Sequence, residues 1–145
     1  MGNKIEPYLL YEDVPAAIDW LGKAFGFRET LRFTGEDGTV NHAEIRIGDA
    51  LVMLGDPGGD YQDPIRHGHR SQLLVVYVDD VDKHYEQAVA AGATIIREPR
   101  DEPYGLRMYR AEDPFGFEWD FATEIRQVDP EEWGAVPAEP GPGGS

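Results

Sequence analysis

Asp120 is the carboxylate of this sequence whose position most favours chemistry. It shares one face of a strand predicted over residues 117–123 with Glu118, while Trp119 and Phe121 share the other face. If the two aromatic side chains pack beneath a helix, Asp120 points to the opposite side, where a buried carboxylate can act as a general base or bind a cationic ligand. A solvated strand carboxylate is an equally weighted interpretation of Asp120.

A second group of polar side chains lies on the strand predicted over residues 40–47. Polar and apolar residues alternate strictly there, so His42 and Glu44 lie close enough for a histidine–carboxylate pair or half of a metal site. A wet sheet face completed by Arg46 is the favoured interpretation. The sequence His67-Gly68-His69 also resembles a metal-binding pair, but it lies in a glycine-rich stretch without a fixed third ligand.

Aromatic and apolar side chains indicate a small-molecule site more strongly than the polar ones do. Strand alternation allows four of them to line one cavity with the apolar composition usual for such sites, namely Tyr8, Met53, Leu73 and Tyr77. Three residues around a later hairpin would form its rim, with a guanidinium available to an anionic group: Tyr104, Arg107 and Tyr109. Trp133, in the C-terminal segment, is a further ligand-binding candidate. Plain core packing is the alternative interpretation of this whole set.

The elements that must position these residues occur twice along the chain. In each half an apolar strand leads into Asp-Val, an amphipathic helix, a glycine and three further strands. We therefore predict an α+β fold of two tandem βαβββ modules, 4–56 and 71–123, whose eight strands form a curled mixed sheet around a cavity. Both modules belong to one domain, 1–128, with a linker over 57–70. The tail over 129–145 is rich in proline and glycine and is expected to be disordered from residue 137.

Composition restricts the partners that this chain can have. Its 145 residues carry a formal net charge of −15, which repels nucleic acid phosphates and anionic membranes. No run of residues approaches the roughly 20 apolar positions of a membrane span. The absence of cysteine excludes disulfides and thiolate ligands, and it fits a reducing compartment. We expect a cytoplasmic protein without nucleic acid or membrane partners.

Three groups of motifs recur in the order and spacing of a known superfamily. They cover nearly all of residues 5–123 and are Asp13-Val14 with Ala17-Ile18-Asp19-Trp20 and Phe25-Gly26-Phe27, then Val78-Asp79-Asp80-Val81-Asp82 with Ala91-Gly92-Ala93, and finally Asp113-Pro114-Phe115-Gly116. Through them the chain resembles the vicinal-oxygen-chelate superfamily, which contains glyoxalase I, extradiol dioxygenases, fosfomycin-resistance enzymes and bleomycin-binding proteins. The resemblance implies paired βαβββ units around a concave cavity, commonly in a homodimer. It also implies a divalent metal in that cavity, with ligand positions that fall on Glu6, Met53, Leu73 and Asp120.

Two of these four positions carry side chains that suit a metal poorly. Leu73 has no lone pair, and the Met53 thioether is a soft ligand that Mg²⁺, Mn²⁺ and Zn²⁺ bind weakly. We therefore expect no cofactor, and a protein that binds a hydrophobic or aromatic small molecule as the bleomycin-binding branch does. The alternative is a metal-dependent lyase, transferase or dioxygenase, with Glu6 and Asp120 as catalytic carboxylates and a divalent ion held by Glu6, His42, Glu44 and Asp120. A catalytically silent dimer with a regulatory role is a third possibility.

Overall fold

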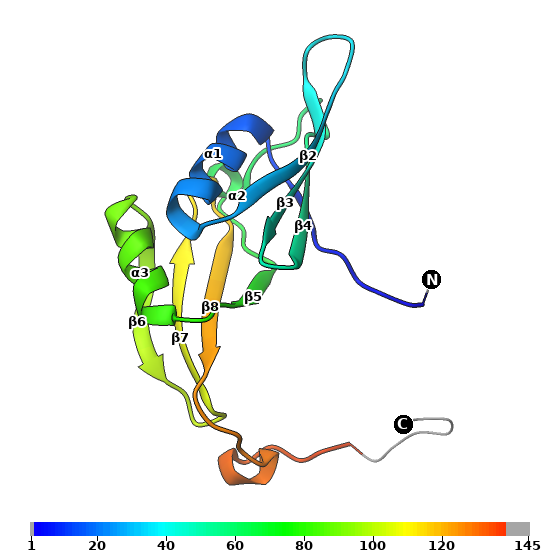
Figure 1. Ribbon diagram of the computed structural model, residues 1–145. Helices are drawn as coiled ribbons and strands as arrows, with labels where there is room; N and C mark the ends of the chain where they lie inside the picture. Colours follow the sequence, from blue (N-terminus) through cyan, green and yellow to red (C-terminus); the bar gives the residue numbers. More distant parts are fainter. Residues whose placement is uncertain (1, 139–145) are drawn as a thin grey trace.

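The computed structural model describes residues 2–138 and contains the two predicted modules in tandem (Figure 1). The first module consists of β1 (Tyr8–Leu10), α1 (Val14–Phe25), β2 (Arg28–Thr34), β3 (Val40–Ile47) and β4 (Ala50–Gly55). The second repeats this order with β5 (Leu73–Tyr77), α3 (Val81–Ala90), β6 (Thr94–Asp101), β7 (Leu106–Glu112) and β8 (Glu118–Glu124). A short helix, α2 (Pro64–His67), lies in the linker, and a 3₁₀ helix, η1 (Pro130–Trp133), follows β8. The disorder expected from residue 137 falls mainly on residues 139–145, outside the described part of the chain.

Equivalent aspartates begin the helices of the two modules. The Asp13 carboxylate accepts a hydrogen bond from the Ala16 backbone N–H at 3.0 Å, and Asp80 accepts one from Lys83 at 3.1 Å. Such caps satisfy one of the N–H groups that a helix leaves unpaired in its first turn. Gly26 ends α1 in the left-handed conformation, with φ of 81°. The predicted starts of both helices are therefore confirmed, and so is the glycine cap of α1.

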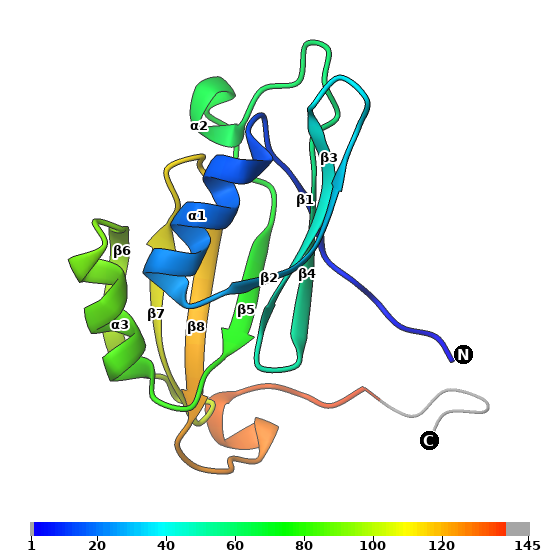
Figure 2. The ribbon, with the colours of Figure 1, turned by 45° about the horizontal axis from the view of Figure 1, so that its top comes forward.

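The eight strands form two four-stranded mixed sheets of the same topology, not one continuous sheet. Their strand orders are β1-β4-β3-β2 and β5-β8-β7-β6, with the first strand of each module parallel to the last. Figures 1 and 2 show both sheets with α1 and α3 on the same side of the molecule. The tandem βαβββ architecture is thus confirmed, and the sheets do not close into a barrel.

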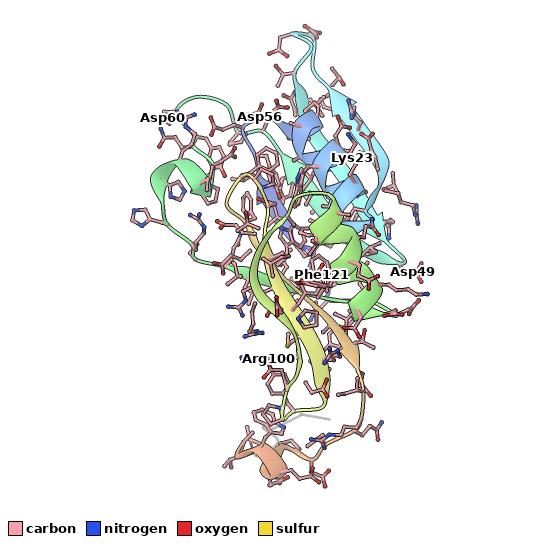
Figure 3. The ribbon with its side chains drawn as sticks, turned by 90° about the vertical axis from the view of Figure 1, so that its left-hand side faces the viewer. Lys23, Asp49, Asp56, Asp60, Arg100 and Phe121 are labelled. Carbon is pink, nitrogen blue, oxygen red and sulfur yellow. The ribbon has the colours of Figure 1, made fainter. Side chains whose placement is uncertain are left out.

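Aromatic side chains dominate the core between the helices and the second sheet. Trp119 and Phe121 on β8 are fully buried, as the alternation of that strand predicted, and both rings contact Phe25 of α1. Figure 3 labels Phe121 near the centre of the molecule. Burial of apolar area of this size is the main stabilising contribution to a domain of this length. We call the sheet faces that point away from the helices the open faces. Every second side chain of each strand lies on an open face.

A buried aspartate in the β7–β8 turn connects the two modules. Asp113 accepts hydrogen bonds from the hydroxyl of Tyr11 in the first module at 3.0 Å and from the indole N–H of Trp119 at 3.1 Å. The backbone N–H groups of Phe115 and Phe117 donate to its other oxygen, both at 3.0 Å. The Asp-Pro-Phe-Gly motif therefore has a structural role. Its carboxylate fixes the turn through the two backbone N–H groups and links the turn to the first module through the Tyr11 hydroxyl.

His84 is buried, although its position between Lys83 and Tyr85 suggested an exposed residue. It lies at helical spacing from the buried residues Val81 and Ala88. Its Nε2 lies 2.7 Å from the Phe25 carbonyl oxygen and its Nδ1 lies 2.6 Å from the Tyr109 hydroxyl. A neutral ring satisfies both contacts, with Nε2–H donating to the carbonyl and Nδ1 accepting from the hydroxyl.

We expect His84 to make the protein less stable in weak acid. Burial lowers the pKa of His84 below its usual value of 6.5, so the native ring stays neutral at a pH where the unfolded ring binds a proton. The free energy of unfolding should therefore fall as the pH drops below about 6.5. Denaturant unfolding between pH 8 and pH 5 should show a stability difference between wild type and His84→Asn that narrows toward low pH. Substitution of the exposed His67 by asparagine should leave the wild-type profile unchanged, and an equal narrowing there would contradict this assignment.

Among the helices of residues 2–138, none combines the length and the apolar content that a membrane span requires.

Candidate functional site

A cavity of about 830 Å³ lies at the end of the second sheet where η1 packs. Its aromatic lining residues are Tyr77 of β5, Tyr104 of the β6–β7 turn and Trp133 of η1. Tyr77 is 61% exposed, Trp133 44% and Tyr104 37%, so all three rings present apolar surface to a ligand. Volumes between about 300 and 1,000 Å³ are usual for small-molecule sites. We call this region the aromatic cavity.

The chain after β8 folds back over the β6–β7 turn and thereby places Trp133 beside Tyr104. The backbone N–H of Ile125 donates to the Gly105 carbonyl oxygen at 2.9 Å. A Cβ atom at Gly105 would lie 2.3 Å from the Arg126 carbonyl oxygen, so only glycine permits this crossing. The Trp133 and Tyr104 rings then meet edge to face, with centroids 5.5 Å apart.

Acidic side chains give the aromatic cavity a negative charge. Its lining includes the carboxylates of Glu124, Asp129 and Glu132 and one guanidinium, that of Arg126. Arg126 lies 3.8 Å from Glu132. Within residues 2–138, Glu124 and Asp129 form no ion pair. The cavity therefore carries two uncompensated carboxylates beside three aromatic rings.

Asp120 is buried on the open face of the second sheet and is paired with an arginine. The Asp120 side chain is 4% exposed, and Arg110 on β7 lies directly opposite it in the register of the hairpin. Arg110 Nε donates to one carboxylate oxygen at 2.7 Å and Nη2 donates to the other at 3.1 Å. This two-pronged hydrogen bonding raises the pKa of Arg110 above its already high value. The alternation that placed Asp120 opposite Trp119 and Phe121 is confirmed, but both of its oxygens are occupied.

A second polar arrangement lies on the open face of the first sheet. The Tyr8 hydroxyl lies 2.8 Å from His42 Nδ1, and His42 Nε2 lies 3.2 Å from a Glu44 carboxylate oxygen. Tyr8 also lines a smaller cavity of about 290 Å³ between β1, the linker and the β7–β8 turn. His42 and Glu44 thus form the histidine–carboxylate pair that their spacing allowed, with a tyrosine as its third member.

The structure does not gather the predicted ligand-binding residues into one cavity. Three of them meet in the aromatic cavity: Tyr77, Tyr104 and Trp133. Tyr8 lines the smaller cavity, whereas Met53 and Leu73 line neither of these two. The modules contribute to separate sheets, so residues at equivalent strand positions lie on two different open faces.

Arg107 and Tyr109 do not form the predicted rim, and that prediction was wrong. Side chains alternate along β7, and those of Leu106, Met108 and Arg110 point to the open face. Arg107 and Tyr109 therefore point to the helices. Tyr109 is fully buried beside His84, and burial raises its pKa. Arg107 forms ion pairs with Asp82 at 3.1 Å and Asp101 at 3.0 Å on the helix side.

Sequence reasoning missed Arg110, although a signal for it was present. The turn motif that begins at Asp113 fixes Glu112 opposite Glu118, and counting back along both strands places Arg110 opposite Asp120. Arg126 and Glu124 were also missed, because they line the cavity only through the fold of the chain after β8, where alternation gives no guide.

Comparison with known proteins defines the family of this chain. The family model described as Glyoxalase/Bleomycin resistance protein/Dioxygenase superfamily matches residues 4–121. The chain belongs to this superfamily. Its resemblance to vicinal-oxygen-chelate proteins, as the sequence motifs indicated, is thereby confirmed.

Sequence and structural relatives match most of the chain. An uncharacterized protein of Mycobacterium bovis is 34% identical over 144 residues, which cover 96% of this chain and 95% of the relative. The crystal structure of TioX from Micromonospora sp. ML1 has a TM-score of 0.69 and 35% identity, covering 88% of this chain and all of TioX. The fosfomycin resistance protein FosX from Mesorhizobium loti has a TM-score of 0.60 at 17% identity, covering 85% and 92%, and shares the fold.

Superfamily members often depend on a metal, but the donors at the expected positions do not fit one. The side chains of Leu73 and Met53 supply no hard donor. Asp120 is bound through both oxygens by Arg110, and Glu6 pairs with Lys4 at 3.4 Å. Within residues 2–138 no group of three or more histidine, aspartate or glutamate side chains is arranged to hold an ion.

The alternative metal set is not assembled either. His42 and Glu44 bond to each other on the first sheet, whereas Asp120 lies on the second sheet beneath Arg110. The four residues of this set, Glu6, His42, Glu44 and Asp120, therefore form no common metal site within residues 2–138.

Proposed function

We propose that this chain is a binding protein that holds an aromatic small molecule in the aromatic cavity without a metal. The observation that carries this proposal is the convergence of Tyr77, Tyr104 and Trp133 on one volume of about 830 Å³. Each ring is partly exposed and held by its own element, so a planar ligand can stack without the protein first reorganising. TioX has a similar length and fold, and its 35% identity makes it a suitable comparison protein for the same ligands.

The charges of the cavity favour a ligand with a positive group. Glu124 and Asp129 have no cationic partner within the described residues, so a bound cation would gain Coulombic attraction to both. The aromatic faces attract a cation as well, through their negative quadrupole. A planar aromatic cation should therefore bind more tightly than an anion of the same ring size, and more weakly as the salt concentration rises.

We expect removal of the Trp133 ring to weaken binding of a planar aromatic cation by about 3- to 10-fold, in keeping with a loss of about 1 kcal/mol per aromatic contact. Fluorescence titration with proflavine measures this dissociation constant for wild type and Trp133→Ala, and anthracene-9-carboxylate serves as the planar anion. Phe33→Ala is the matched control, because Phe33 is 59% exposed but lies on the first sheet. Failure of both probes to bind would contradict the proposal, as would an equal loss in the Phe33 variant or stoichiometric metal in protein purified without added metal.

A homodimer in the cytoplasm completes this proposal. The open face of the first sheet exposes Leu31 at 45% and Phe33 at 59%, and a second copy would remove this apolar surface from water. Sedimentation velocity across a concentration series measures the association. A monomer at all concentrations would contradict the dimer but not the ligand site.

A further inference from the structure

Tyr8, His42 and Glu44 form a continuous hydrogen-bonded chain across three strands. Tyr8 lies on β1, and its ring crosses β4 to bring the hydroxyl oxygen 2.8 Å from His42 Nδ1 on β3. His42 Nε2 lies 3.2 Å from Glu44 Oε2, two residues further along β3. The order of the groups is hydroxyl, imidazole, carboxylate, which is the order found in nucleophilic triads.

Gly55 on β4 is the residue that allows the Tyr8 ring to cross. Gly55 lies opposite His42 in the sheet register. A Cβ atom built on Gly55 would lie 2.6 Å from Tyr8 Cε1 and 2.8 Å from its hydroxyl oxygen, well inside van der Waals contact. The Tyr8 ring therefore rests directly on the β4 backbone, and a methyl group there would displace it. The φ angle of Gly55 is negative, so the backbone itself accepts alanine.

The partner atoms determine which proton each member carries. Glu44 is an acceptor when ionised, so the imidazole presents Nε2–H to it and keeps a lone pair on Nδ1. That lone pair accepts the Tyr8 O–H. His42 is thus oriented by a carboxylate and positioned to remove the proton from a tyrosine hydroxyl.

The Tyr8 side chain is accessible to a small molecule. It is 45% exposed and lines the cavity of about 290 Å³ together with Tyr61 and residues of the linker. We propose that Tyr8, His42 and Glu44 form a reactive triad in which Tyr8 is a nucleophile toward small acyl or sulfonyl electrophiles. The site is separate from the aromatic cavity, so a failure of ligand binding there would not contradict this proposal.

The proposed step conserves atoms and charge. The Tyr8 hydroxyl oxygen attacks the carbonyl carbon or sulfonyl sulfur of the electrophile, and its proton moves to His42 Nδ1. The bond from that centre to the leaving group breaks, and the leaving group departs with the bonding electron pair. Glu44 stabilises the imidazolium while it lasts, and the proton then passes to the leaving group or to water. The products are Tyr8 esterified through its oxygen and the free leaving group.

Labelling with methanesulfonyl fluoride, which has no ring for the aromatic cavity to hold, followed by peptide mass spectrometry, tests the triad without a known substrate. Tyr77 is the internal control, because it is 61% exposed and forms no hydrogen bond through its hydroxyl within the described residues. Exposure alone predicts faster labelling of Tyr77 than of Tyr8. We expect Tyr8 to be labelled at least about 10-fold faster, a modest part of what an adjacent general base contributes.

Three variants separate activation from simple access. His42→Phe and Glu44→Gln should slow Tyr8 labelling, His42→Phe down to the Tyr77 rate. Gly55→Ala should slow it to the same level by displacing the Tyr8 ring from His42, although it changes none of the three triad residues themselves. An unchanged Tyr77 rate in each variant reports an intact fold. Tyr8 labelling no faster than that of Tyr77 in wild type, or unaffected by His42→Phe, would overturn the proposal.

Discussion

Replacing Asp113 with alanine is expected to lower the free energy of unfolding by about 3 to 5 kcal/mol, because the change leaves several buried donors without an acceptor. The Asp113 carboxylate is 2% exposed and accepts from two side chains and two backbone N–H groups. One donor, Tyr11, is fully buried and belongs to the other module. The substitution should therefore loosen the contact between modules as well as the turn. Urea unfolding, followed by tryptophan fluorescence, measures the change.

Two further variants show whether the hydrogen bonds of Asp113 cause this loss. Asp49 occupies the corresponding β3–β4 turn of the first module but is exposed, so Asp49→Ala should cost less than about 0.5 kcal/mol. Asp113→Asn keeps the shape but replaces one acceptor by an N–H₂ group, and it should cost less than alanine. A similar loss for Asp49→Ala and Asp113→Ala would contradict the assigned role.

The ionisation of Asp113 gives the same carboxyl a pH signature. Burial raises its pKa to about 6, although its four donors act in the opposite direction. The native carboxyl then holds its proton at a pH where the unfolded one has lost it. The stability advantage of wild type over Asp113→Asn should therefore shrink as the pH rises from 4 through 6, opposite in sign to the His84 effect.

The duplication in the sequence predicted the architecture because each module satisfies its own local rules. Asp13 and Asp80 cap their helices, Gly26 ends α1, and alternation along β3 and β8 assigns the correct faces. These features depend on neighbours within a few residues. The separation of the strands into two sheets could not be predicted in this way, since it depends on how β1 and β5 lie relative to each other.

The candidate site was predicted only in part, for a related reason. Tyr77 and Tyr104 were identified as aromatic candidates, but the cavity that they share is completed by η1 and by the chain from Glu124 to Trp133. Tyr109 was assigned to the wrong face because hairpin position alone was used, without the alternation that buries it. Tyr8 was expected to line a cavity, but its contact with His42 depends on the missing side chain of Gly55, a relation between three strands.

Removing Arg110 is the second substitution for which we expect a large effect, about 2 to 3 kcal/mol of lost stability for Arg110→Met. Breaking a buried ion pair costs about 3 to 5 kcal/mol because one charge is left without a partner, and the 28% exposure of the Arg110 side chain reduces this figure. Arg107 offers a matched control on the same strand. It also pairs with two carboxylates, but those are 57% and 63% exposed, so Arg107→Met should cost less than about 1 kcal/mol. Equal losses for the two variants would show that burial of Asp120 does not matter.

The double variant Arg110→Met with Asp120→Leu distinguishes a lost attraction from an unpaired charge. If the cost of Arg110→Met comes from the buried carboxylate that remains, removing that carboxylate as well should recover most of the stability.

Arg110→Met alone also tests metal binding, because it frees both oxygens of Asp120. Of the four metal positions that the family resemblance implies, Asp120 is the one on the second sheet with a hard donor. Leu73 and Met53 still provide no hard donor, so Mg²⁺ or Mn²⁺ should not raise the melting temperature of this variant. A rise would mean that Arg110 alone prevents metal binding in this chain, and that the donor set is sufficient after all.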